Sequence, residues 1–212
     1  MRILLKLASY LFHPIWMPLA GSLFYFLFTP RFFPQEIIEA KLLAISIITI
    51  FIPIVFYFLL KNLGKATNIF LDEVEERKWP LFFFILLNLM VLNQVLNIYN
   101  YPGLFYYFTG ILGTTIITYL FSLFRMKLSL HMAGIGGLLM FVIGFCIYFH
   151  LYFIYTISFL IIAAGLSASS RLYYKAHTKW ELILGFLAGL IPQIAMFSFW
   201  FTEYRMSDLF LG

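Results

Sequence analysis

Charged residues are scarce in this chain. Of its 212 residues only 11% are Asp, Glu, Lys or Arg, whereas 63% are hydrophobic and 21% are aromatic. A soluble globular domain carries roughly 25% charged residues, so the composition excludes an ordinary soluble protein and predicts an integral membrane protein. The longest polar stretch, 61–79, is too short for a separate soluble domain, and we therefore expect a single membrane domain over 1–212.

The sequence also lacks a pair of cysteines, a clear signal-peptide cleavage site and a basic stripe for nucleic acid. The single cysteine, Cys146, excludes an intrachain disulfide and lies in an apolar segment, which is typical of a small core residue. The first apolar segment lacks a clear small-x-small cleavage site, so we expect a membrane span there and not a signal peptide. There is no basic stripe outside the loops between apolar tracts, so the net charge of +5 favours anionic lipid headgroups as partners and not nucleic acid.

The charge-free tracts predict the membrane spans. A helix needs about 20 apolar residues to cross the bilayer core, so each of the two longest tracts must form a hairpin. The expected spans are 7–29, 42–60, 81–98, 103–124, 132–149, 151–169 and 182–201. The predicted fold class is therefore all-α, a polytopic bundle of six to seven transmembrane helices, with six if the first segment lies in the interface. Pro14 and Pro18 should kink the first span.

The basic residues are distributed unevenly between the two membrane faces. With seven spans, one face holds the N-terminus and the loops 61–79, 125–131 and 170–180. Eleven of the fourteen Lys and Arg residues lie on this face: Arg2, Lys6, Lys61, Lys65, Arg77, Lys78, Arg125, Lys127, Arg171, Lys175 and Lys179. The positive-inside rule predicts that this face is cytoplasmic.

The loop 61–79 and the residue His13 each allow a structural and a functional interpretation. Apolar residues recur at helical spacing over 63–74, which predicts a short interfacial helix. Arg77 and Lys78 precede Trp79-Pro80, where we expect the next span to begin, and they are either boundary charges or a headgroup-binding pair. For His13 we favour a structural role, bonded to a carbonyl that the neighbouring prolines free.

The segment 168–181 carries the clearest chemical pattern. If a helix continues from Thr178, His177 and Glu181 lie one turn apart on the same face. The carboxylate then accepts the Nδ1 proton and leaves Nε2 free to attack an electrophile. Arg171, six residues before His177, has the planar donor geometry that binds phosphate. The segment therefore predicts a nucleophile, its orienting group and an anion clamp.

A second histidine lies on the same predicted face. His131 follows Ser129 and opens a segment rich in small residues, and a helix N-terminus favours an anion. One interpretation is a residue at the membrane boundary. The other is a functional group that shares a site with His177.

At these residues the chain resembles the type-2 phosphatidic acid phosphatase and haloperoxidase superfamily, and more specifically a divergent bacterial branch of it. The motif Ser-Arg-x5-His-x3-Asp is matched by Ser170, Arg171 and His177, with Glu181 in place of the aspartate. Of the motif Pro-Ser-Gly-His, Ser129 and His131 remain. The motif Lys-x6-Arg-Pro is represented only by Arg77-Lys78-Trp79-Pro80, which lacks the lysine.

The resemblance implies a membrane phosphatase that hydrolyses a lipid phosphate or diphosphate through a phosphohistidine, in a bacterial inner membrane. His177 would be the nucleophile, Glu181 its orienting group and His131 the general acid and base. The residues Arg171, Arg77, Lys78, Lys127 and Ser129 would bind the phosphate. The resemblance implies no metal and no cofactor, and it leaves the oligomeric state open.

Other functions remain open on the same residues. A catalytically degenerate relative would bind or move a phospholipid or polyprenyl phosphate without hydrolysis. The spacing of Asn68, Asp72 and Glu76 is also compatible with an intramembrane prenyltransferase, although such an enzyme needs a second acidic cluster for magnesium. A metal site built from His131, His177 and the loop acids is a further alternative.

Overall fold

The protein is an all-α membrane bundle, as predicted. The computed structural model describes residues 2–71 and 73–211. Within these ranges, seven helices are long and apolar enough to cross a membrane: Leu5–Phe28, Gln35–Asn62, Val74–Val95, Pro102–Leu123, Leu130–Phe149, Ile154–Tyr173 and Lys179–Thr202. The last belongs to a longer helix, α9 (Lys179–Leu211). The chain is therefore an integral membrane protein.

Helix α7 (Leu130–Phe149) lies at the centre of the bundle and packs against α2 (Met17–Phe28), α6 (Pro102–Leu123), α8 (Ile154–Tyr173) and α9. Its contact with α9 is a backbone contact. A Cβ atom at Gly189 would overlap the Ala133 carbonyl, and one at Gly185 would come within 2.6 Å of the Ser129 carbonyl oxygen. These glycines let the start of α7, with His131, lie directly against the start of α9.

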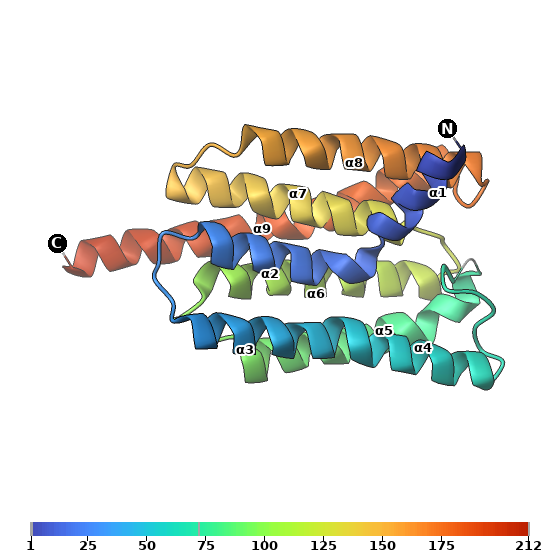
Figure 1. Ribbon diagram of the computed structural model, residues 1–212, viewed down its shortest axis with the longest axis horizontal. Coiled ribbons are helices and arrows are strands. Elements are labelled where there is room, and N and C mark those ends of the chain that lie inside the picture. Colours follow the sequence, from blue (N-terminus) through green and yellow to red (C-terminus); the bar gives the residue numbers. More distant parts are fainter. Residues whose placement is uncertain (1, 72, 212) are drawn as a thin grey trace.

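The first span is broken into two helices, so the predicted kink is confirmed and is larger than expected. Helix α1 (Arg2–Leu11) ends before His13, a 3-10 turn covers Pro14–Trp16, and α2 follows. His13 is extended, with φ −64° and ψ 136°, because the ring of Pro14 disfavours a helical residue before it. As a result α1 packs on α8 whereas α2 packs on α7 (Figure 1).

The predicted interfacial helix over 63–74 is wrong. Helix α4 (Ile52–Asn62) ends there, because Gly64 adopts a left-handed conformation with φ +69°. The chain then forms turns, in which the Asn68 side chain accepts a 2.9 Å hydrogen bond from the Phe70 N–H. Such local side-chain bonds compete with helix formation.

The predicted start of the third span at Pro80 is also wrong. Helix α5 begins at Val74 and runs to Met90, so Trp79 and Pro80 lie inside it. Glu75 and Glu76 occupy its first turn, where carboxylates stabilise the helix dipole. The second span is likewise longer than predicted, because α3 (Gln35–Ser46) joins α4 through a π turn at Ile47–Phe51.

One end of the bundle gathers segments that are far apart in the sequence. Helix α1 and the connections between α4 and α5, α6 and α7, and α8 and α9 all lie at this end (Figure 1). This is the grouping that the charge pattern predicted. The structure thereby brings most of the basic residues of the chain to one side of the bundle.

Candidate functional site

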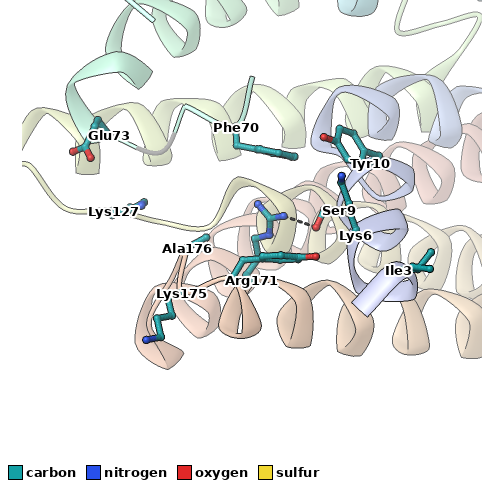
Figure 2. Close-up of a pocket in the computed structure, with 11 residues that line it drawn as sticks. Ile3, Lys6, Ser9, Tyr10, Phe70, Glu73, Lys127, Arg171, Lys175 and Ala176 are labelled. Atoms are coloured by element: carbon teal, nitrogen blue, oxygen red, sulfur yellow. Dashed lines mark hydrogen bonds between the residues drawn. The ribbon is translucent and has the colours of Figure 1, made fainter. Parts of the chain in front are cut away.

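A cavity of about 810 Å³ opens at this end of the bundle. Its lining includes Ile3, Lys6, Ser9, Tyr10, Phe70, Glu73, Lys127, Arg171, Tyr174, Lys175 and Ala176. Figure 2 shows these residues arriving from α1, the loop before α5, the α6–α7 loop and the end of α8. Four of the lining side chains are cationic and one is a carboxylate, so the cavity favours an anionic ligand.

Arg171 lies in the last turn of α8 and is buried, with 5% of its surface exposed. Its Nη2 donates a hydrogen bond to Ser9 Oγ on α1. The guanidinium carbon lies 4.8 Å from the centre of the Phe70 ring, which covers one face of the group (Figure 2). Arg171 is thus held between α1 and the loop before α5, at the wall of the cavity.

His177 and Glu181 form the expected pair. His177 Nδ1 lies 2.8 Å from Glu181 Oε2. The pairing arises from the start of α9: the Thr178 N–H donates to Glu181 Oε2 and the Glu181 N–H donates to Thr178 Oγ1, a capping box. Since a carboxylate only accepts, Nδ1 carries the proton and Nε2 keeps its lone pair. The pairing therefore leaves Nε2 as the unprotonated nitrogen of the ring.

The surroundings of His177 keep it uncharged. Burial lowers the pKa of His177 from 6.5 to about 4, and the nearby Arg77 and Lys127 act in the same direction. The hydrogen bond from Nδ1 to Glu181 opposes this shift but does not cancel it. His177 is therefore neutral at pH 7, the state in which its Nε2 can attack. Arg77 and Lys127 are thus close enough to His177 to act on it electrostatically.

This pKa predicts the acid limit of any reaction that uses His177 as a nucleophile. Because only neutral imidazole attacks, the rate should fall as the pH drops through about 4, and not through the ordinary histidine value of 6.5. The unfolded chain binds this proton first, so folding stability should also decrease as the pH falls from 6.5 towards 4. A pH–rate profile of kcat/KM tests this, and an acid limb near 6.5 would contradict it.

His131 lies in the same region. Its Nε2 is 3.0 Å from the Ser9 carbonyl oxygen, and only 5% of its surface is exposed. Its ring centre lies 5.2 Å from that of His13 and 6.1 Å from that of Phe70. His131 also lies within electrostatic range of Arg171 and His177. The structure therefore brings together the two predicted histidines and Arg171.

Of the remaining predicted phosphate ligands, Arg77 and Lys127 act electrostatically on His177, whereas the described contacts of Lys78 and Ser129 are made elsewhere. Arg77 is buried near His177, and it donates hydrogen bonds of 2.7 Å to the carbonyls of Leu71 and Leu128, which ties two loops together. Lys127 lines the cavity. Lys78, in contrast, forms a 2.5 Å ion pair with the exposed Glu75.

Ser129 also has a structural contact. It is fully buried and caps α7, since its hydroxyl accepts from the Met132 N–H. Its own N–H donates to the Glu181 carbonyl at 3.1 Å. Phosphate binding by Lys78 and Ser129 stays a prediction, without support from these contacts.

Sequence reasoning missed several residues of this region. Ser9, Lys6 and Phe70 had no pattern that pointed to a site. His13 was expected to bond a freed carbonyl, but its Nδ1 accepts from the Ile15 N–H at 3.3 Å, and its ring lies beside His131. The His-Pro dipeptide was the available signal, since it breaks the first span at the level of the site.

The acidic residues do not form a metal site in the part of the chain that the structure describes. No group of three or more His, Cys, Asp or Glu side chains that could hold a metal ion occurs over 2–71 and 73–211. Glu76 Oε1 accepts from the Thr67 N–H at 3.1 Å. Asp72, which belongs to the spacing that suggested a prenyltransferase, lies outside the described residues.

These observations define a polytopic helical membrane protein with a cationic cavity at one end of the bundle and, at the same end, a buried histidine paired with a partly exposed glutamate. The sequence matches no protein-family model, and comparisons with curated proteins and with solved structures also give no match. The resemblance to the phosphatase superfamily therefore stays a prediction.

Proposed function

We propose that this protein is a membrane phosphatase that hydrolyses a lipid phosphate or diphosphate through a phosphohistidine intermediate. The observation that carries the proposal is the pair of His177 and Glu181, in which the imidazole is neutral and lies within electrostatic range of Arg77 and Lys127. A neutral, oriented imidazole next to cations is what attack on a phosphate ester requires.

In the first step, His177 Nε2 attacks phosphorus and the bond from phosphorus to the leaving oxygen breaks. His131, as the imidazolium with a proton on each ring nitrogen, gives its Nδ1 proton to that oxygen and becomes neutral. In the second step, His131 takes a proton from water, whose oxygen attacks phosphorus, and the bond to Nε2 breaks to release phosphate. Arg171 and Lys127 stabilise the charge on the equatorial oxygens, which is the main contribution to catalysis of phosphoryl transfer.

The shape of the cavity supports a substrate with a lipid tail. Its α1 wall includes Ile3, which is 77% exposed, and Tyr10, which is 49% exposed. An apolar wall beside the cations suits a ligand with an anionic head and an acyl or prenyl chain. We further propose that the protein lies in a bacterial inner membrane, with this basic end in the cytoplasm.

A second candidate function is binding or movement of a lipid phosphate without hydrolysis. It is favoured by the position of Phe70, which covers one face of Arg171. Among the described residues, the cavity lining includes Arg171 and Lys127 but neither His177 nor His131. A ligand in the cavity therefore meets these cations and not the histidines, which is what binding without hydrolysis requires.

Phosphate release by the purified protein separates the two functions. The substrates are phosphatidic acid and a polyprenyl diphosphate in detergent micelles, assayed with and without a chelator. The phosphatase proposal expects release of inorganic phosphate that the chelator leaves unchanged. Saturable binding without release would contradict it and favour the second function.

A further inference from the structure

Ser9 on α1 contacts both groups that flank the proposed reaction centre. Its hydroxyl accepts a hydrogen bond from Arg171 Nη2. Its backbone carbonyl oxygen lies 3.0 Å from His131 Nε2. A carbonyl oxygen only accepts, so Nε2 of His131 carries a proton, and Nδ1 is the ring nitrogen that does not bond this carbonyl. One residue, 2% exposed, therefore fixes the orientation of a guanidinium and an imidazole that come from two different helices.

The Ser9 carbonyl is available because α1 stops. In a continuous helix the carbonyl of Ser9 would accept from the N–H of His13. Here the His13 N–H donates to the Tyr10 carbonyl at 3.3 Å, because Pro14 holds His13 in an extended conformation. The break in the first span thus leaves the Ser9 carbonyl free of its helical partner, the His13 N–H, so that it can accept from His131 Nε2.

The hydroxyl of Ser9 is held in place by α8. Ser9 Oγ lies 2.6 Å from Ser170 Oγ, and Ser170 Oγ donates to the Leu5 carbonyl at 2.7 Å. Ser170 contacts α1 in the same network but is not the partner that Arg171 Nη2 bonds. The two serines therefore share a role in packing α1 on α8, and Ser9 also carries the contact to Arg171 Nη2.

We propose that Ser9 is a positioning residue for the proposed phosphatase, and that the Pro14 break makes this possible. The hydroxyl orients Arg171 towards the phosphate. The carbonyl accepts from Nε2–H of His131, so that in the imidazolium form of His131 the second proton is on Nδ1 and passes from there to the leaving oxygen. The inference rests on the proposed function for its catalytic consequence. The hydrogen bond to His131 itself can be measured without turnover.

The experiment uses two variants and a matched control for each. Ser9→Ala removes the hydroxyl, and Ser22→Ala is its control because Ser22 is another buried serine of the first span, whose hydroxyl donates to the carbonyl four residues earlier. Pro14→Ala lets His13 become helical and compete for the Ser9 carbonyl, and Pro18→Ala is its control in the same span. Each full-length protein is assayed with phosphatidic acid, whose leaving group needs a proton, and with p-nitrophenyl phosphate, whose leaving group does not.

Each variant has its own expected signature. Pro14→Ala should lower kcat for phosphatidic acid about tenfold or more and change kcat for p-nitrophenyl phosphate by less than about threefold, because only the first needs the general acid. Ser9→Ala should raise KM for both substrates about tenfold, the effect of losing one hydrogen bond to a charged group. Ser22→Ala and Pro18→Ala should stay within about twofold of the wild type.

Equal losses in Ser9→Ala and Ser22→Ala would overturn the role of the hydroxyl. Equal losses on both substrates in Pro14→Ala would overturn the role of the carbonyl. If the wild type hydrolyses neither substrate, the proposed function fails, and ¹⁵N spectra of the histidines decide the positioning alone. The Nε2–H signal of His131 should then change in Pro14→Ala and not in Pro18→Ala; an unchanged signal in both would overturn the inference.

Discussion

Replacement of His177 by alanine should lower the release of phosphate from phosphatidic acid by about a thousandfold or more, the usual cost of removing a catalytic nucleophile. The reason is that His177 Nε2 forms the covalent bond to phosphorus, and no other described contact supplies a carboxylate-oriented imidazole at this position. Binding of the lipid should be largely retained, because the cations that line the cavity are unchanged. The measurement is kcat under saturating substrate, together with the affinity for the lipid.

The matched control is His150→Asn at the opposite end of α7. His150 caps that helix in a left-handed conformation with φ 53°, which asparagine tolerates. This variant should retain wild-type turnover. A His177→Ala protein with more than about a tenth of wild-type turnover would rule out the phosphohistidine, since loss of a nucleophile costs far more than that.

The second large effect is expected from Arg171→Lys, which should lower kcat/KM about a hundredfold to a thousandfold, as for other arginines that stabilise transferred phosphoryl groups. Lysine keeps the charge but lacks the planar guanidinium group. In Arg171 this group donates to Ser9 Oγ, and one of its faces packs on the Phe70 ring. The measurement is kcat/KM for phosphatidic acid in detergent micelles.

Arg125→Lys is the control for this substitution. Arg125 has a side chain that is 83% exposed and lies 3.5 Å from Glu75 at the surface. Its replacement should change kcat/KM by less than about threefold, as expected of an exposed ion pair. Similar losses in both variants would mean that the reaction depends on general positive charge and not on the geometry of Arg171.

The spans and the grouping of the site residues could be predicted from sequence because they depend on the absence of charge. A bilayer excludes charged groups over about 20 residues, so the position of each span follows from composition. The number of spans then decides which loops share a face, and this placed His131, Arg171 and His177 at one end. The pair of His177 and Glu181 followed from local spacing.

The sequence could not show which contact each side chain makes in the folded chain. Arg77 and Lys78 are adjacent, so they point in different directions from α5, and sequence could not tell which one faces the site. The structure buries Arg77 against the Leu71 and Leu128 carbonyls and pairs Lys78 with Glu75. Ser9 gave no signal at all, because its role depends on α8 and α7 approaching the broken end of α1.

The most direct test of the account is to trap the covalent intermediate. Purified protein is mixed with ³²P-labelled phosphatidic acid and quenched within a few milliseconds, and the labelled residue is identified by peptide mapping. The account predicts label on His177 that is stable to alkali, is released by acid and is absent from His177→Ala. Phosphate release without any label on His177, or label on a different residue, would contradict it.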